Sequence, residues 1–324
     1  MDEEKFYYGG QAVIEGVMMR GKSSLAVAIR QGQDTILVDG WDIRKSEKAP
    51  EFLKWPLIRG SVNLVDSLMI GVKTLIYSAN QALAEDEEEE TLSNTQVAIT
   101  VAVSLGLSIA LFFLLPAFLA QLIRRWAPGH GLQNVLEAIM RIGIFLIYIL
   151  CISGIQDVQR VFQYHGAEHK TIYTYEAGLP LTVENAGAMS RLHPRCGTSF
   201  LLLVMVVSVF IYSLLPPMTL VLRLLSRILL LPVIAGIAYE LIRLAGRRLD
   251  HPIVAAISWP GLQLQRLTTK EPDDSQLEVA IAALTRVLQN DGILPKPSQD
   301  IDSETAAQDP MYKANENEAD TPFG

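Results

Sequence analysis

Five consecutive residues carry the side chains best suited to chemistry in this chain: His165-Gly166-Ala167-Glu168-His169. In a helix, the imidazoles of His165 and His169 lie one turn apart on one face, as two histidines that share a metal ion must. Glu168 falls beside them, where a carboxylate can take a proton from a metal-bound water molecule. The spacing therefore predicts a divalent metal site, for zinc in particular, with His165 and His169 as ligands and Glu168 as the general base.

A zinc site of this kind needs a third protein ligand, and a structural site needs a fourth. Our first choice is Glu240, because a carboxylate within an apolar segment is costly and by default marks function; its alternative is an ion pair with Arg243. Glu176 lies on the same predicted helix as the motif, and His193 and Cys196 form a His-x-x-Cys pair. Glu240 or Glu176 would leave a position for water, whereas His193 together with Cys196 would close the site. For Cys196, the alternatives are a buried thiol and a nucleophile next to His193.

The elements that must position these residues are mostly apolar helices. Of 324 residues, 50% are hydrophobic, and the mean hydropathy is positive. A helix needs about 17–25 residues to cross a hydrocarbon core, and four segments fit: 95–123, 136–155, 199–215 and 220–244. We expect four transmembrane helices within a membrane domain at 95–248, of which the last two could instead form a re-entrant hairpin. The helix with the motif is expected to continue from the second span to Gly178, where Pro180 follows.

The distribution of basic residues predicts the orientation. No signal peptide opens the chain, so the N-terminus should stay in the cytoplasm. Four spans then place the C-terminus and the 158–197 loop on the same side. Of the 27 lysines and arginines, 22 lie in segments assigned to that side, in agreement with the positive-inside rule. We therefore expect a multi-pass protein of the bacterial inner membrane, with both termini and the motif facing the cytoplasm.

The remaining segments are assigned from composition and pattern. Residues 1–55 predict a small β-rich cytoplasmic unit, with a hairpin of 24–31 and 35–38 and a further strand with glycine-marked bends at 9–20. A unit this small should dock on the rest of the protein or on another subunit, as in a homo-oligomer. The other segments are an amphipathic interfacial helix with an acidic linker at 56–94, a cytoplasmic helical segment at 249–293 and a disordered tail at 294–324.

Charge and cysteine content exclude some partners. The net charge of −8 comes largely from the acidic run at 85–90 and the C-terminal tail, and the basic residues form no concentrated patch. Nucleic acid is therefore not expected as a partner, whereas the lipid bilayer is. The two cysteines, Cys151 and Cys196, fall in a span and on the reducing side, so a disulfide is not expected.

Four sequence blocks resemble the YqhQ-like family of bacterial membrane proteins. They are residues 9–20, 164–171, 193–200 and 260–269, which read GGQAVIEGVMMR, YHGAEHKT, HPRCGTSF and PGLQLQRLTT. That family is a domain of unknown function that is predicted to be a metal-dependent enzyme. The resemblance therefore implies the membrane setting, the fold and a metal ion, and it supplies no substrate.

Two functions are consistent with the sequence. The first is a membrane-embedded, metal-dependent hydrolase that acts on a peptide or a lipid-linked substrate at the cytoplasmic face. The order His-x-x-Glu-His also occurs in inverzincin metalloproteases, but those are soluble α/β proteins, and we expect shared chemistry without common descent. The alternative is a non-enzymatic membrane scaffold or assembly factor with a structural metal or none. Transport is less favoured, because the predicted spans hold few polar groups.

Overall fold

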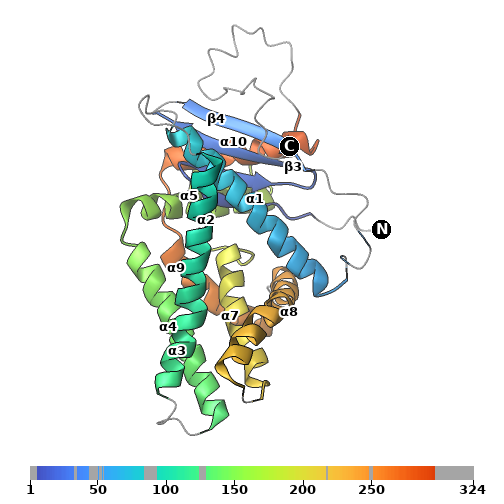
Figure 1. Ribbon diagram of the computed structural model, residues 1–324. Helices are drawn as coiled ribbons and strands as arrows, with labels where there is room; N and C mark the ends of the chain where they lie inside the picture. The colour runs from blue at the N-terminus through green and yellow to red at the C-terminus, as the bar shows by residue number, and fades with distance from the viewer. Residues whose placement is uncertain are drawn as a thin grey trace.

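The computed structural model describes residues 6–32, 35–43, 50, 53, 55–83, 93–123, 129–216, 218–247 and 251–295. Figure 1 shows a β-sheet at one end of the molecule and a group of helices that extends away from it. The described residues are mostly helical and the N-terminal part forms the sheet, so the predicted fold class is confirmed at this level. The acidic run at 85–90 and the predicted tail from residue 296 onward lie outside the described residues.

The sheet consists of four antiparallel strands in chain order. They are β1 (Gly9–Val13), β2 (Gly16–Arg20), β3 (Ser24–Gln31) and β4 (Thr35–Asp42). The predicted hairpin is confirmed, with Gln31 opposite Thr35. The segment 9–20 is two strands where we expected one, because the chain reverses at Ile14 and Glu15. Glu15 makes this reversal with a φ of 53°, in the left-handed region that few residues other than glycine adopt.

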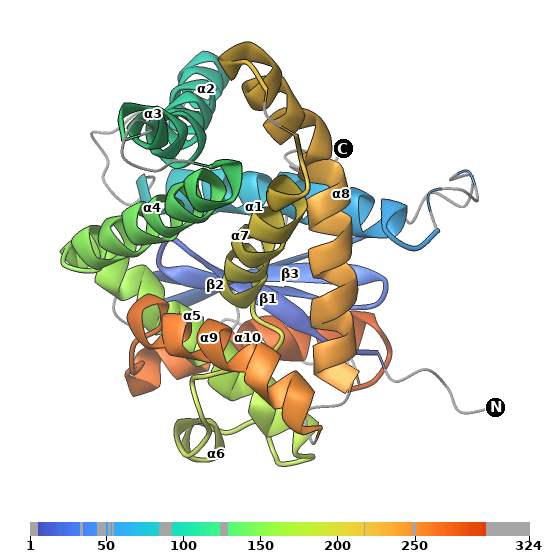
Figure 2. The same ribbon diagram turned by 90° about the horizontal axis from the view of Figure 1, so that it is seen from below.

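Helices cover both faces of the sheet. On one face pack α5 (Gln156–Glu176) and α10 (Asp274–Asn290), and on the other packs α1 (Ile58–Leu83). Figure 2 shows the sheet from below, with α1 running across it. A four-stranded sheet on its own has too little core to be stable, and these helices supply the missing apolar contacts. The expectation that the N-terminal unit docks on the rest of the chain is confirmed, and docking on another subunit stays a prediction.

Most of the remaining helices form the part of the molecule that extends away from the sheet. The remaining elements are α2 (Asn94–Ile109), a π-helical turn η2 (Ala110–Leu114), α3 (Leu115–Leu122), α4 (His130–Ile152), α6 (Val183–Gly187), α7 (Gly197–Ser213), α8 (Leu220–Arg247) and α9 (Pro252–Thr268). The short α6 packs against α5 and α10, beside the sheet. The others are mainly apolar in sequence, and α7 lies between α8, α9 and α4.

Among the described residues, four stretches of helix are long and apolar enough to cross a membrane: 58–82, 95–122, 131–152 and 221–244. The number equals the number of spans that we expected, but the set differs. It includes most of α1, which we assigned to the membrane surface, and it leaves out α7, which has 17 residues and a length of about 25 Å. In the 95–122 stretch no residue of the most apolar window is buried. An apolar surface of that size needs a cover such as lipid.

Candidate metal centre

Helix α5 carries both histidines and the glutamate of the motif. It begins at Gln156, after Ile155 takes an extended conformation, whereas α4 ends at Ile152. The expectation of one continuous helix is therefore wrong, and the break lets α5 lie against β1 and α10 (Figure 1). The predicted end is confirmed. Gly178 has a φ of 69° just after the helix, a left-handed conformation that glycine adopts without strain.

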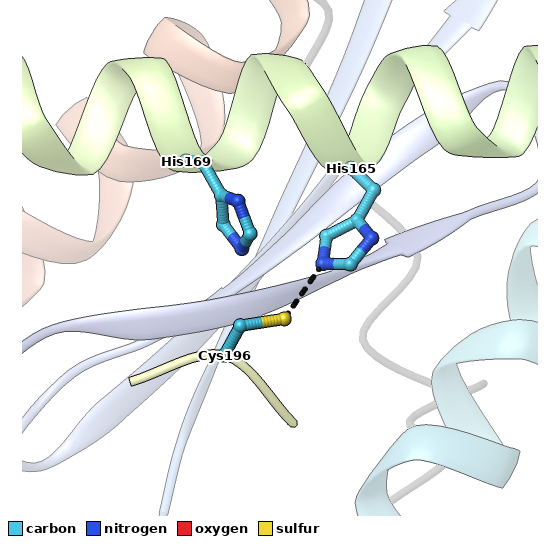
Figure 3. Close-up of side chains that lie close together, drawn as sticks. All are labelled: His165, His169 and Cys196. Atoms are coloured by element: carbon cyan, nitrogen blue, oxygen red, sulfur yellow. Dashed lines mark hydrogen bonds between the residues drawn. The ribbon is translucent and has the colours of Figure 1, made fainter. Parts of the chain in front are cut away.

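Three potential metal ligands converge beside α5: His165, His169 and Cys196. Figure 3 shows the two imidazoles projecting from the helix toward the sulfur, which comes from a separate segment. One ligand atom from each residue lies within 4.8 Å of the others, and Sγ of Cys196 is 3.1 Å from Nε2 of His165. Ligand atoms around a tetrahedral zinc ion are about 3.3–3.6 Å apart. Small side-chain adjustments would therefore fit the three donors to zinc.

Backbone carbonyl groups fix the orientation of both imidazoles. Nδ1 of His165 lies 2.9 Å from the carbonyl oxygen of Thr268, and Nδ1 of His169 lies 2.6 Å from that of Arg191. A carbonyl oxygen can only accept, so each Nδ1 must donate its proton. In a neutral imidazole this leaves Nε2 with its lone pair available to a metal, as second-sphere hydrogen bonds do in known metal sites.

Glu168 lies beside the three donors and outside their group. Its Oε2 is 4.0 Å from Nε2 of His165 and 3.9 Å from Nε2 of His169, and the side chain is buried. Gly10 of β1 makes room for it, because a Cβ atom at that position would lie 3.2 Å from Cγ of Glu168. The carboxylate is thus placed to accept a hydrogen bond from a water molecule held among the donors.

Cys196 and His165 alter each other's protonation. Burial raises the pKa of the Cys196 thiol, but the adjacent His165 outweighs burial and holds that pKa well below its ordinary value. Burial likewise lowers the pKa of His165, but the Cys196 sulfur outweighs it and raises the pKa to about 9. Both shifts favour the thiolate–imidazolium form of the pair. The thiolate is the form of cysteine that binds metals and attacks electrophiles.

The loop that contains Cys196 is held by Gln265 of α9. Its side chain accepts a hydrogen bond from the backbone N–H of His193 (2.7 Å) and donates to the His193 carbonyl (2.7 Å) and to Oγ of Ser199 (2.8 Å). Gly261, one turn earlier, permits this contact, since a Cβ atom there would lie 2.6 Å from Oγ of Ser199. A buried amide with these three bonds gives the loop one position relative to α9.

The glycine inside the motif serves the packing of α5. A Cβ atom on Gly166 would lie 2.1 Å from the carbonyl oxygen of Lys270, and the N–H of Lys270 donates to the carbonyl of Phe162 at 2.8 Å. The segment after α9 therefore touches the backbone of α5 directly. This contact places Thr268 next to His165.

Glu176 and His193 lie near the centre and are engaged with each other. Oε2 of Glu176 is 3.6 Å from Nε2 of His193, and its Oε1 accepts from the Arg195 guanidinium. Burial raises the pKa of Glu176, but His193 and Arg195 outweigh it and lower that pKa. Burial also lowers the pKa of His193. The His193 ring is 5.5 Å from that of His169, centroid to centroid, outside the group of three.

The structure does not bring Glu240 to the histidines. Both of its carboxylate oxygens accept hydrogen bonds from Arg59, at 2.7 and 2.6 Å. This pair joins α8 to α1, which pack closely because Gly60 and Gly236 lie at their contact. Our first choice of third ligand therefore needs correction: among the predicted candidates, Cys196 is the one whose ligand atom lies with those of the two histidines. The alternative prediction for Glu240 is an ion pair with Arg243; the structure has an ion pair, but its partner is Arg59.

A cavity of about 330 Å³ opens onto the three donors. Its wall includes all three donors, Glu168, and the start of α7 at Gly197 and Thr198. The opposite wall is β1, which contributes Gly9, Gly10, Gln11 and Ala12. Gly10 and Ala12 belong to one face of the strand, and Gly9 and Gln11 to the other. The cavity therefore runs along the outer edge of β1, which is the end of the described sheet.

Sequence reasoning missed the residues that hold the centre in place. The carbonyls of Thr268 and Arg191 have no signal in the sequence, because every residue carries one. Gly10 and Gln265 lie in blocks 9–20 and 260–269, for which the sequence pattern predicts no role at the candidate site. The contacts of Gly10 with Glu168 and of Gln265 with the Cys196 loop form only when the fold brings these blocks together.

The chain belongs to the family described as "Protein of unknown function (DUF1385)", whose family model matches residues 55–290. It is 37% identical over 308 residues to the "Uncharacterized protein YqhQ" of Bacillus subtilis (strain 168), a match that covers 91% of this chain and 97% of that protein. No solved structure matches. The resemblance to YqhQ-like proteins is confirmed, while neither description names a metal or an enzymatic activity.

Proposed function

We propose that this member of the DUF1385 family is a zinc-dependent hydrolase of the bacterial cell membrane. One observation carries the proposal. The imidazoles of His165 and His169 turn their Nε2 atoms toward the Cys196 sulfur, and two backbone carbonyls fix their Nδ1 atoms. This arrangement supplies three protein ligands, as catalytic zinc sites have, and leaves a fourth position open to the cavity.

Each residue at the centre has a defined role in this proposal. A zinc ion there would polarise the scissile carbonyl and lower the pKa of a bound water molecule to about 7. Glu168 takes the proton from the attacking water and later gives it to the leaving group. The Thr268 and Arg191 carbonyls keep the imidazoles in the tautomer that binds metal. Neutral histidines are required, so bound zinc replaces the proton that His165 otherwise holds.

The walls of the cavity favour an extended peptide as the substrate. The outer edge of β1 offers backbone N–H and C=O groups, and sheets bind extended peptides by adding them as a further strand at such an edge. Gly9 and Gly10 leave this edge without side chains at the point nearest to Glu168. A peptide paired with β1 would pass directly by the three donors.

We place the site at the cytoplasmic face of the inner membrane. The apolar stretches at 95–122, 131–152 and 221–244 support insertion, and the excess of basic residues in the segments on the side of the motif supports the orientation. Labelling of cysteines in intact cells tests the orientation. Reaction of a cysteine at position 175 with a membrane-impermeant reagent would contradict it.

Peptide cleavage by the purified full chain tests the activity. The protein is loaded with one equivalent of zinc in mild detergent and incubated with a mixture of defined peptides, whose products are identified by mass spectrometry. We expect cleavage that a chelator stops and that added zinc restores. Products formed equally by a His165→Ala, His169→Ala variant would show that the centre is not responsible.

A second candidate is a metal-free thiol hydrolase. It is favoured by the 3.1 Å contact between Cys196 and His165 and by the Thr268 carbonyl, which orients the imidazole as the third group of a triad does. The two candidates differ in their inhibitors. A chelator should abolish activity that depends on zinc and leave thiol chemistry intact. Iodoacetamide should inactivate the metal-free protein if Cys196 is the nucleophile, and it should leave the zinc-loaded protein active if Cys196 is a zinc ligand.

A further inference from the structure

A second cluster of charged side chains lies at the end of the helices away from the sheet. Glu137 of α4 faces three arginines: Arg141, one turn later on α4, and Arg223 and Arg227 of α8. A carboxylate oxygen of Glu137 lies 2.9 Å from Arg141, 3.3 Å from Arg227 and 3.8 Å from Arg223. In Figure 1 this is the region where α4 begins and where α7 leads into α8.

The cluster holds more positive than negative charge. One carboxylate faces three guanidinium groups, which leaves a net charge of +2. The sequence offers no second acid nearby, because Glu137 is the single acidic residue in 95–156 and 197–239 contains none. Arg124 and Arg125, in the segment before α4, are also basic. The segments 95–156 and 197–239 therefore offer no second carboxylate to neutralise the excess.

Burial makes the excess costly. The side chains of Glu137, Arg141 and Arg227 are exposed by only 4%, 7% and 5%. The Tyr212 ring lies 4.0 Å from the Arg227 guanidinium and 5.4 Å from that of Arg141. Nε of Arg227 is buried and has no hydrogen-bond partner among the described residues. The three guanidinium groups share one carboxylate, and buried charge that is only partly compensated is unfavourable; a charge within a span by default marks a site.

Of the three arginines, Arg223 lies nearest to the start of its helix, at the end of the bundle away from the sheet. It follows the first residue of α8 by three residues, and Arg227 follows it by seven, which corresponds to about 5 Å and about 10 Å along the axis. Under the proposed orientation this is the side of the membrane opposite to the His165 motif. The positive-inside rule disfavours basic residues on that side, so it does not account for Arg223 and Arg227.

We infer that the cluster binds the phosphate of an anionic phospholipid from the outer leaflet of the membrane. The entry is a notch lined by Asn134, Tyr212, Met218, Arg223 and Arg227, with free space of about 10 Å³. This space admits about one oxygen-sized group and not a headgroup. The phosphate therefore rests at the mouth, where the Arg223 side chain, at 15% the most exposed of the three arginines, reaches it. The inference rests on the proposed membrane insertion and not on the proposed hydrolase activity.

Competition between lipids tests the inference. The full chain is delipidated in mild detergent, mixed with phosphatidylglycerol and phosphatidylcholine, and examined by native mass spectrometry. We expect the wild type to retain phosphatidylglycerol selectively. Arg223→Gln should weaken this retention on the order of ten-fold, since it removes one charge-assisted hydrogen bond. Arg266→Gln, an exposed arginine at the other end of the bundle, serves as the matched control and should retain the lipid normally.

Thermal stability without lipid distinguishes binding from a purely structural role. In the lipid-free protein the third guanidinium adds to the excess charge, so Arg223→Gln should keep the wild-type melting temperature or raise it. A lower melting temperature together with unchanged lipid retention would overturn the inference. Equal retention of both lipids by the wild type would also overturn it. If inorganic phosphate stabilises the detergent-solubilised protein as much as phosphatidylglycerol does, the ligand is a soluble anion and the assignment to a lipid is wrong.

Discussion

Replacement of Glu168 by glutamine separates catalysis from metal binding. The amide has almost the shape of the carboxylate, and the side chain is buried against Gly10, so Glu168→Gln should keep the fold. Glu168 lies outside the group of three donors whose ligand atoms come within 4.8 Å of one another, and the proposal assigns it the role of base. Glu168→Gln should therefore keep zinc.

The expected loss of activity follows from the role of the base. A glutamine cannot accept the proton of the attacking water, and loss of a general base typically slows a reaction by about 10²–10⁴-fold. This corresponds to an increase of about 2.7–5.5 kcal/mol in the activation barrier. The assay is the initial rate of peptide cleavage at saturating zinc, with zinc content measured on the same sample. Glu184→Gln, an exposed glutamate in α6, is the control and should behave as the wild type.

Two results would refute this reasoning. Loss of zinc from Glu168→Gln would show that Glu168 is a ligand, and the site would then be a closed or rearranged one. A fully active Glu168→Gln protein with one zinc per chain would show that no proton passes through Glu168. That second result would mean that another group acts as the base.

Three further predictions concern other residues. Gly166→Ala should destabilise the protein by about 1–3 kcal/mol, because its Cβ atom would meet the Lys270 carbonyl at 2.1 Å; an unchanged melting temperature would contradict this. Glu240→Gln should keep full zinc content, because its carboxylate binds Arg59; zinc loss measured by mass spectrometry would return Glu240 to the ligand set. Burial raises the pKa of Asp291, but hydrogen bonds from Lys22 and Ser23 outweigh it and lower the pKa below its ordinary value of 3.8. The stabilisation from Asp291 should therefore be present above about pH 4 and be lost as the pH falls through the lowered pKa. The free energy of unfolding of Asp291→Asn, measured with denaturant, should be lower than that of the wild type at neutral pH and should converge with it in acid.

Local patterns made the helix with the His-x-x-Glu-His motif predictable. The spacing of His165 and His169 and the stop at Gly178 depend only on helix geometry, and the structure has both. The sheet was predictable in outline for a similar reason, since β-branched runs mark strands and glycines mark turns. The break between α4 and α5 was not, because Ser153 and Ile155 do not themselves prevent a helix.

The third ligand could not be chosen from sequence alone. Glu240 and Cys196 lie 71 and 27 residues from His169, and which of them reaches the histidines depends on how α7, α8 and α9 pack. Glu240 looked functional because it lies in an apolar helix, but Arg59 lies on a helix that packs against it. Gln265 instead fixes the loop of Cys196, through contacts between residues more than sixty positions apart.

Zinc content is the most direct measurement of the central claim. The full chain is purified in detergent from cells grown with zinc, and metals are quantified by inductively coupled plasma mass spectrometry. The variants are His165→Ala, His169→Ala and Cys196→Ala. We predict one zinc per wild-type chain and loss of most zinc in each variant, because two remaining ligands hold a divalent ion poorly. A folded wild type without metal that takes up no zinc on titration, or a His165→Ala, His169→Ala double variant with one zinc per chain, would contradict the proposed centre.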